Sequence, residues 1–235
     1  MKDLLDLLHS HLAEQYSSSA SNGDKHAQYK LAQLYESGQG VPRNTQKAVD
    51  LYTKSAEQGN PDAQFHLGLL HDEGKLLPQD FGTALKWYTL ASEQEHPSAL
   101  GYLGVMYFHG YAVEQDFKKA RRLLQNASQQ GHANSQYFLG KIYAQGLGIK
   151  QNLKLASTWY KKSSDQGHPE AQNSLGLLYA KGDGLEKDDI SAYMWFNISA
   201  SFGNLNALQN VKLIEEQMTQ DQITEAHKKF KIYIR

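Results

Sequence analysis

The chain has 235 residues, with 24 Lys and Arg against 25 Asp and Glu, so its formal net charge is −1. A near-neutral chain lacks the basic face that a nucleic-acid-binding protein needs to displace counterions from phosphates, so we expect no nucleic-acid partner. The chain has no cysteine, which excludes disulfides and thiolate metal sites. It also has no run of about 18 apolar residues, so we expect no membrane insertion.

The first predicted element is a helix over residues 3–20. Polar Asp3, Asp6 and His9 interrupt its apolar residues, which argues against a signal peptide and favours a cytoplasmic protein. Tyr16 lies 36 residues before Tyr52, which belongs to the second helix of the first repeat. Residues 1–26 are therefore predicted to be a half-repeat that caps the N-terminus.

The chain then repeats itself every 36 residues from residue 27 to residue 206. Each repeat opens on a small residue: Ala27, Ala63, Ala99, Ser135 and Ala171. Each also has an alanine 21 positions later: Ala48, Ala84, Ala120, Ala156 and Ala192. Apolar residues at offsets 0, 4, 7 and 8 form the stripe of an amphipathic helix, so each repeat is predicted to hold two helices, A and B. The predicted repeats are 27–62, 63–98, 99–134, 135–170 and 171–206.

Turn residues separate these helices. A glycine follows helix A in every repeat, where it can adopt the left-handed conformation: Gly38, Gly74, Gly110, Gly146 and Gly182. An N-cap residue precedes every helix B: Asn44, Asp80, Asp116, Asn152 and Asp188. Glu95 stands where the other repeats place a glycine after helix B, so we expect a slightly altered turn there.

The last predicted elements are a helix of type A, from Ala207 to about Gln217, and a final helix through Phe230. Thr219 and Gln222 form a Thr-x-x-Gln capping box that opens the final helix. Residues 207–235 are therefore predicted to be a helical pair that caps the C-terminus. The whole pattern predicts an all-α solenoid of five helix-pair repeats with helical end caps.

The spacing Leu-Gly-x-x-Tyr-x-x-Gly-x-Gly, followed by an N-cap, Ala and Trp-Tyr, resembles the Sel-one-like repeat family. The fourth repeat carries it in Leu139, Gly140, Tyr143, Gly146, Gly148, Asn152, Ala156, Trp159 and Tyr160. This family is related to the tetratricopeptide repeats and has bacterial members. The resemblance implies a right-handed α/α superhelix and an adaptor or scaffold role. This role comes from the resemblance and not from the spacing, because fold alone does not fix function.

By analogy with tetratricopeptide repeats, the A helices would line a concave wall. Positions 2, 6, 9 and 10 of helix A vary between repeats, whereas the framework does not, so we interpret them as surface. The predicted partner-binding residues are Tyr29, Gln33, Glu36, Phe65, Leu69, Asp72, Val105, Phe108, His109, Tyr137 and Lys141. Ala144, Gln145, Leu177 and Lys181 occupy the same positions of later repeats. The alternative is that the aromatic residues pack between adjacent helices.

Acidic residues of this wall lie in the early repeats, and basic residues lie in the later ones. Glu36, Asp72 and Glu73 contrast with Lys141 and Lys181. A partner of opposite polarity could be oriented by this gradient.

The sequence shows no catalytic motif. His96, His132 and His168 recur at one repeat position, which is typical of turn or capping residues and not of metal ligands. We therefore predict no catalytic residue, no metal site and no cofactor. The favoured function is an adaptor that binds a protein or peptide, as a monomer or weak dimer. The alternatives are an immunity-type inhibitor of an effector enzyme and, from another class, a small-molecule-binding or hydrolytic enzyme.

Overall fold

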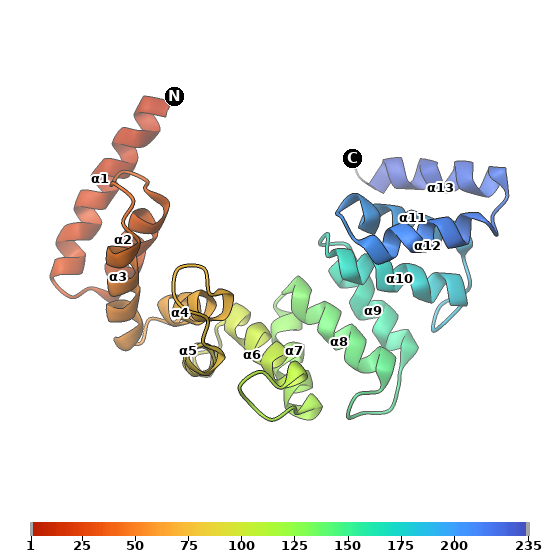
Figure 1. Cartoon of the computed structure of the whole chain (residues 1–235), viewed down its shortest axis with the longest axis horizontal. Helices are drawn as coiled ribbons and strands as arrows, with labels where there is room; N and C mark the ends of the chain where they lie inside the picture. Colours follow the sequence, from red (N-terminus) through yellow and green to blue (C-terminus); the bar gives the residue numbers. More distant parts are fainter. Residues whose placement is uncertain (1, 234–235) are drawn as a thin grey trace. The chain divides into compact units, whose positions relative to one another are not determined.

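The computed structural model describes the backbone of residues 2–233 and the side chains of residues 8–233. Within this range the chain forms thirteen α-helices and no strand (Figure 1). Their bounds are α1 Lys2–Ser21, α2 Lys25–Ser37, α3 Thr45–Glu57, α4 Pro61–Glu73, α5 Phe81–Glu93, α6 Pro97–His109, α7 Phe117–Gln129, α8 Ala133–Gln145, α9 Leu153–Ser164, α10 Pro169–Lys181, α11 Asp189–Ser201, α12 Leu205–Glu215 and α13 Gln220–Tyr233. The all-α prediction is confirmed, with α2 to α11 as five pairs of helices A and B.

The chain divides into two compact units. The first comprises residues 1–106 and 110–114, and the second comprises residues 107–109 and 115–235. In the first unit α2 packs on α3, and α3 packs on α4. In the second unit α9 packs on both α8 and α10, and α11 packs on α10, α12 and α13. Each unit is thus built from helices that contact their neighbours in the chain, as a tandem repeat requires.

Side-chain caps and glycines set the helix bounds. Each helix B begins after its predicted Asn or Asp, whose side chain accepts a backbone N–H, as Asn152 does from Leu155 at 2.9 Å. Gly38, Gly74, Gly146 and Gly182 end their helices in the left-handed conformation. The N-cap predictions are confirmed because these residue types satisfy backbone donors that the helix itself leaves open.

Small residues let paired helices approach closely. In the first unit, the core includes Ala32, Ala48, Tyr52, Ala56, Ala63, Leu67 and Leu70. In the second unit, a Cβ atom added to Gly140 would lie 2.6 Å from the ring of Tyr160, so the glycine admits this ring against α8. A framework of Ala and Gly against an aromatic ring therefore recurs from repeat to repeat.

The turn at Glu95 is not altered, contrary to the sequence-based expectation. Glu95 adopts φ 59°, and its N–H donates to the Ser92 carbonyl at 3.0 Å. Gly59 of the first repeat, with φ 77°, donates in the same way to Ala56 at 2.9 Å. The expectation was wrong because a non-glycine residue can occupy the left-handed region when the surrounding turn fixes it, at a conformational cost of about 1–2 kcal/mol.

The chain ends also form helices. The capping box is confirmed, because Thr219 N–H donates to Gln222 Oε1 at 2.8 Å and Gln222 N–H donates to Thr219 Oγ1 at 3.3 Å. Met1, Ile234 and Arg235, which belong to the predicted capping segments, lie outside the described residues. The division of the chain into caps 1–26 and 207–235 around five repeats stays a prediction.

Candidate interaction surface

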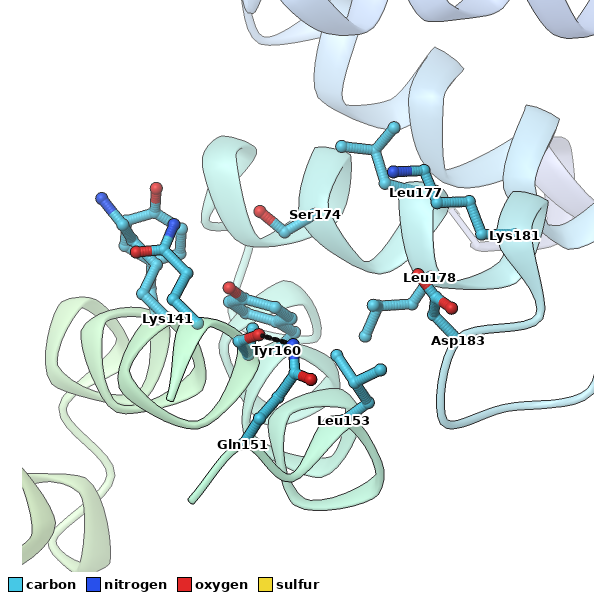
Figure 2. Close-up of a pocket in the computed structure, with 12 residues that line it drawn as sticks. Lys141, Gln151, Leu153, Tyr160, Ser174, Leu177, Leu178, Lys181 and Asp183 are labelled. Carbon is cyan, nitrogen blue, oxygen red and sulfur yellow. Dashed lines mark hydrogen bonds between the residues drawn. The ribbon is translucent and has the colours of Figure 1, made fainter. Parts of the chain in front are cut away.

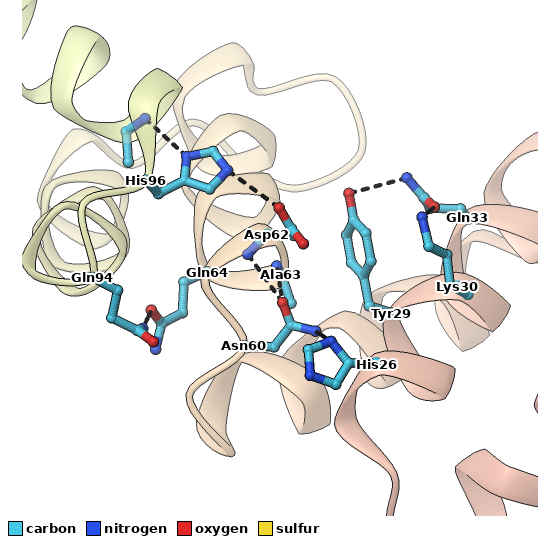
Figure 3. A network of polar contacts seen from close by, with 11 residues as sticks. His26, Tyr29, Lys30, Gln33, Asn60, Asp62, Ala63, Gln64, Gln94 and His96 are labelled. Carbon is cyan, nitrogen blue, oxygen red and sulfur yellow. Dashed lines mark hydrogen bonds and ion pairs between the residues drawn. The ribbon is translucent and has the colours of Figure 1, made fainter. Parts of the chain in front are cut away.

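We call the variable positions 2, 6, 9 and 10 of the A helices the helix A face. Its first members lie on α2, where the Gln33 amide donates to the Tyr29 hydroxyl at 3.0 Å (Figure 3). Both side chains are half-buried. Figure 3 also shows the start of α4, where Asn60 caps the helix by accepting from Asp62 and Ala63 N–H.

Glu36 is held by its own unit. Its Oε2 accepts from the Tyr52 hydroxyl at 2.6 Å and lies 3.0 Å from His66 Nε2. The Tyr52 and His66 rings are 4.2 Å apart, and Tyr29 packs beside them. Burial, together with the carboxylate of Glu36, raises the pKa of Tyr52 far above its ordinary value. This carboxylate thus completes a cluster that joins α2, α3 and α4.

A similar pair lies one repeat further along. Asp72 Oδ2 accepts from the Tyr88 hydroxyl at 3.1 Å, and burial raises the pKa of Asp72. Phe65 stacks on His96 with ring centroids 4.9 Å apart and contacts Tyr102 at 5.4 Å. In the first unit, these predicted surface groups therefore carry internal contacts, while Leu69 and Val105 are half-buried.

The acidic part of the predicted charge gradient is largely satisfied within the first unit. Glu36 and Asp72 accept from tyrosines, and Glu73 pairs with Lys75 at 2.9 Å. These carboxylates retain partial exposure but already have donors. The orienting role that the sequence suggests for them stays a prediction.

In the second unit, Phe108 is 5 % exposed. Its ring contacts Phe117 and Phe138, at 5.5 and 5.0 Å, and Lys141 Nζ lies 5.1 Å from its centroid. For this residue the structure answers the question left open by the sequence, since the ring packs between helices. His109 is exposed. Burial of part of its ring is the main cause that lowers its pKa, and the charge of Lys141 lowers it further.

A cavity of about 490 Å³ opens between α8 and α10 (Figure 2). Six of its lining residues occupy predicted helix A face positions: Tyr137, Lys141, Ala144, Gln145, Leu177 and Lys181. The others are Gln151, Leu153, Tyr160, Ser174, Leu178 and Asp183. The cavity thus lies within the surface class that the sequence predicts, although only Tyr137 and Lys141 belong to the named candidate set.

The cavity combines an apolar floor with charged rims. Figure 2 shows Lys141 on one side, Lys181 and Asp183 on the other, and Tyr160 between them. Among the described residues, neither lysine makes an ion pair, although Lys141 lies over the rings of Tyr137 and Phe138 at 5.8 and 5.6 Å. Both ammonium groups are therefore available to an acidic group that enters the cavity.

Sequence reasoning missed the importance of Tyr160 and Ser174 in this cavity. Tyr160 is only 4 % exposed, burial raises its pKa, and Ser174 lies within hydrogen-bonding reach of its phenol. Tyr160 belongs to a framework position of helix B, and Ser174 belongs to a position outside the set chosen for the helix A face. A signal was present in the contrast between Ala144 and the acids Glu36 and Asp72 at the same repeat position.

Two features of the described residues bear on other kinds of site. No described helix combines the length and apolar character that crossing a membrane demands. No group of three or more His, Asp or Glu side chains in the described part of the chain could hold a metal ion.

Tandem helix pairs with a shared framework and a variable face define an α/α repeat protein. Five consecutive segments match the Sel1 repeat, over residues 25–60, 61–96, 97–132, 133–168 and 169–204. The chain belongs to the Sel1 repeat family. Sel1 repeat proteins are protein-interaction scaffolds, and the family is generally non-enzymatic. No curated protein matches the chain.

Solved structures extend the comparison. A protective antigen of uropathogenic Escherichia coli is 33% identical, with a TM-score of 0.87 over 94% of this chain and 48% of its own. The chain therefore spans about half the length of that antigen. A Sel1 repeat protein of Oxalobacter formigenes is also 33% identical, with a TM-score of 0.75 over 80% of this chain and 75% of its own. An immunity protein of Pseudomonas aeruginosa is 25% identical, with a TM-score of 0.50 over 80% of this chain and 72% of its own.

Proposed function

We propose that the chain is a non-catalytic scaffold that binds a partner protein on its helix A face, with the cavity between α8 and α10 as the main contact. One observation carries this proposal: the cavity is lined by variable positions and presents two lysines without an ion-pair partner. Variable positions on a constant framework are where a repeat protein can adapt to a partner. A mixed apolar and basic cavity supplies both the desolvated centre and the polar rim of an interface.

The remaining candidates form the wider contact in this proposal. Leu69 and Val105 are half-buried apolar residues of the first unit, and Tyr29, Gln33, Glu36, Phe65 and Asp72 lie on α2 and α4 of that unit. In the second unit, His109 and Tyr137 add to the contact beside Lys141. Because several of these groups already have internal partners, we expect their removal to weaken binding less than changes at the cavity.

Site-specific photo-crosslinking in the source cells tests this proposal. A crosslinking amino acid placed at Lys141 or Leu177 should capture one protein. The matched control positions, Lys154 and Thr158, are exposed on α9 and are not part of the cavity lining. Equal capture from both sets would contradict the proposal. Stabilisation by a metabolite without any captured protein would favour the small-molecule alternative instead.

A second candidate is an immunity protein that neutralises an effector enzyme. The likeness to the Pseudomonas aeruginosa immunity protein favours it. Co-expression of the chain with the product of a neighbouring gene should then rescue cells from that product's toxicity. A toxic neighbour that the chain fails to neutralise would argue against this candidate. A bacterial origin is a proposal supported by the bacterial sources of the solved relatives. A cytoplasmic location and a monomer or weak dimer also remain proposals.

A further inference from the structure

The repeats carry an internal comparison of one side-chain pair. Helix B presents a tyrosine at equivalent positions 52, 88 and 160, and the residue 16 positions earlier lies on the paired helix A. In the first two cases that residue is an acid, Glu36 or Asp72, which accepts from the phenol at 2.6 or 3.1 Å. In the third case it is Ala144, and no described carboxylate accepts from Tyr160.

The position without a carboxylate, Ala144, lines the cavity between α8 and α10. Ala144, Tyr160 and Ser174 all line it, so the phenol and a second hydroxyl face the open volume (Figure 2). The other pairs leave no comparable donor, because Leu124 follows Phe108 and Phe196 follows Ala180 at the same spacing. Within the five repeats, only this pair combines a tyrosine with a non-acidic residue.

The surroundings of the cavity suit a carboxylate on an apolar stem. Lys141 and Lys181 supply positive charge, and neither has an ion-pair partner among the described residues. Leu153, Leu177 and Leu178 supply an apolar wall that methylene groups can cover. Asp183 lies beside Leu178, on the side away from Lys141 in Figure 2, so an acidic group is favoured on the Lys141 side.

We propose that this cavity receives a glutamate or aspartate side chain of the partner protein, which takes the place of the carboxylate that Glu36 and Asp72 supply elsewhere. This inference rests on the proposed function and names the chemistry of its main contact. Tyr160 donates a hydrogen bond to an incoming oxygen atom, and the two lysines neutralise the charge of the carboxylate. The Ser174 hydroxyl donates to the Glu170 carbonyl at 2.7 Å, so it lines the cavity as a polar neighbour of the phenol. Charge-assisted hydrogen bonds of this kind are about twice as strong as neutral ones, so they can select an acid over its amide.

A small probe tests the recognition directly. N-acetyl-glutamate N-methylamide, titrated into the isotope-labelled full chain, should shift the methyl NMR signals of Leu177 and Leu178 in a saturable way. The matching glutamine compound should bind at least about tenfold more weakly, because it lacks the charge. N-acetyl-glutamine has a neutral side chain and a free terminal carboxylate, so it distinguishes a side-chain acid from a chain terminus. We expect it to bind more weakly than the glutamate compound. Equal shifts with the neutral glutamine compound would overturn the inference.

Two variants sharpen this test. Ala144→Glu rebuilds the acid-tyrosine pair of the first repeat, so it should abolish the response to the glutamate probe while the chain stays folded. Tyr160→Phe keeps the ring and removes the donor, so binding should weaken by about tenfold. Tyr88→Phe is the matched control, because it removes the same atom where Asp72 already occupies the site, and it should leave probe binding unchanged. Undiminished binding to Ala144→Glu would refute the inference.

Failure of this inference can be told apart from failure of the proposed function. If a protein crosslinks at Leu177 and its affinity is the same for Ala144→Glu as for the natural chain, the scaffold proposal stands and the acidic contact is refuted. If that affinity falls while the affinity for the control Tyr88→Phe is unchanged, both are supported.

Discussion

Buried glutamines illustrate how single residues join the repeats. Gln28, Gln64 and Gln136 each donate to a carbonyl of the preceding helix, at 3.1 to 3.2 Å. Each also accepts from a glutamine 30 residues later, as Gln64 does from Gln94 at 2.8 Å (Figure 3). Gln172 keeps the first bond, to the Ser164 carbonyl, but its buried Oε1 has no partner, because Phe202 stands at the donor position.

We predict that Phe202→Gln stabilises the chain. The new amide would reach Gln172 Oε1 as Gln94 reaches Gln64, and Phe202 is 61 % exposed, so little packing is lost. Satisfying a buried acceptor should raise the free energy of unfolding by about 1 kcal/mol, measured by urea denaturation.

The reverse change supplies the control for this prediction. Gln94→Phe should lower the free energy of unfolding by about 1–3 kcal/mol, because it leaves Gln64 Oε1 without its donor. If Phe202→Gln left stability unchanged while Gln94→Phe lowered it, the buried Oε1 of Gln172 would not be the cause of the deficit.

At the scale of elements, the loop between helices A and B rests on the preceding repeat. Gly184 has φ 74°, and a Cβ atom there would lie 2.4 Å from the Leu153 carbonyl carbon. A Cβ atom at Gly40 would likewise lie 2.3 Å from the His9 carbonyl carbon. At Gly40 and Gly184, the second glycine of the Gly-x-Gly motif is therefore required by contact as well as by conformation, whereas at Gly148 the nearest atom to an added Cβ would be a side-chain carbon at 3.2 Å.

We predict that Gly184→Ala is more destabilising than Gly167→Ala. Both positions have positive φ, but nothing lies within 4 Å of a Cβ atom at Gly167. Gly167→Ala should therefore cost only the conformational strain of about 1–2 kcal/mol. Gly184→Ala should add about 1–3 kcal/mol of steric strain against the backbone of α9, measured by chemical denaturation. Equal losses would show that the loop moves freely away from α9.

Element bounds could be predicted because they depend on local chemistry. Asn and Asp N-caps and left-handed glycines satisfy groups within a few residues of themselves, so the sequence alone reveals them. The turn at Glu95 is the exception, since the surrounding contacts outweigh the preference of that position for glycine. Pairs such as Tyr52 with Glu36 escaped prediction because they join two helices and look like surface residues when each is taken alone.

At the scale of the whole molecule, three histidine caps connect stability to pH. His96, His132 and His168 accept the backbone N–H of Ala99, Ser135 and Ala171 through Nδ1, at 3.2, 3.3 and 3.4 Å. Burial lowers the pKa of all three below the ordinary 6.5, against the opposing charges of Asp62 at His96 and Glu170 at His168, while the charge of His168 further lowers that of His132. Protonation at Nδ1 would remove each acceptor, and at His168 the protonated Nδ1 would gain Glu170 Oε2, 3.2 Å away, as an ion-pair partner that offsets part of the loss.

We predict that stability falls as the pH drops from about 7.5 to about 5. Groups with a lowered pKa in the folded state stabilise it above their ordinary pKa, and this stabilisation is lost as the pH falls through the folded pKa. Each lost cap should cost about 1 kcal/mol. The variant with all three histidines changed to Asn, the residue that caps α4 and α12, should show a flatter profile of unfolding free energy against pH. Identical profiles would contradict this origin.

The repeat period predicts the fold across most of the chain, because stacking imposes the same framework on every unit of 36 residues. The candidate surface was predicted as a class of positions and only partly as residues. Phe108 is variable, yet it is buried because Phe117 and Phe138 surround it. The cavity is lined by Ala144, which has no carboxylate where the first repeat has Glu36. The effect of this difference could not be predicted from the sequence, because it depends on how helices A and B pack together.

The histidine caps also allow the state of individual helices to be followed by NMR. A ring nitrogen that accepts a backbone N–H is unprotonated, so an intact cap fixes its imidazole as the tautomer with the proton on Nε2. His96 is arranged in this way, with Nε2 directed at Asp62 Oδ1 at 3.4 Å. Nitrogen NMR separates the two ring atoms, so α6, α8 and α10 each carry a natural marker at their first turn. Fraying of three individual helices could thus be followed one by one, without any attached label.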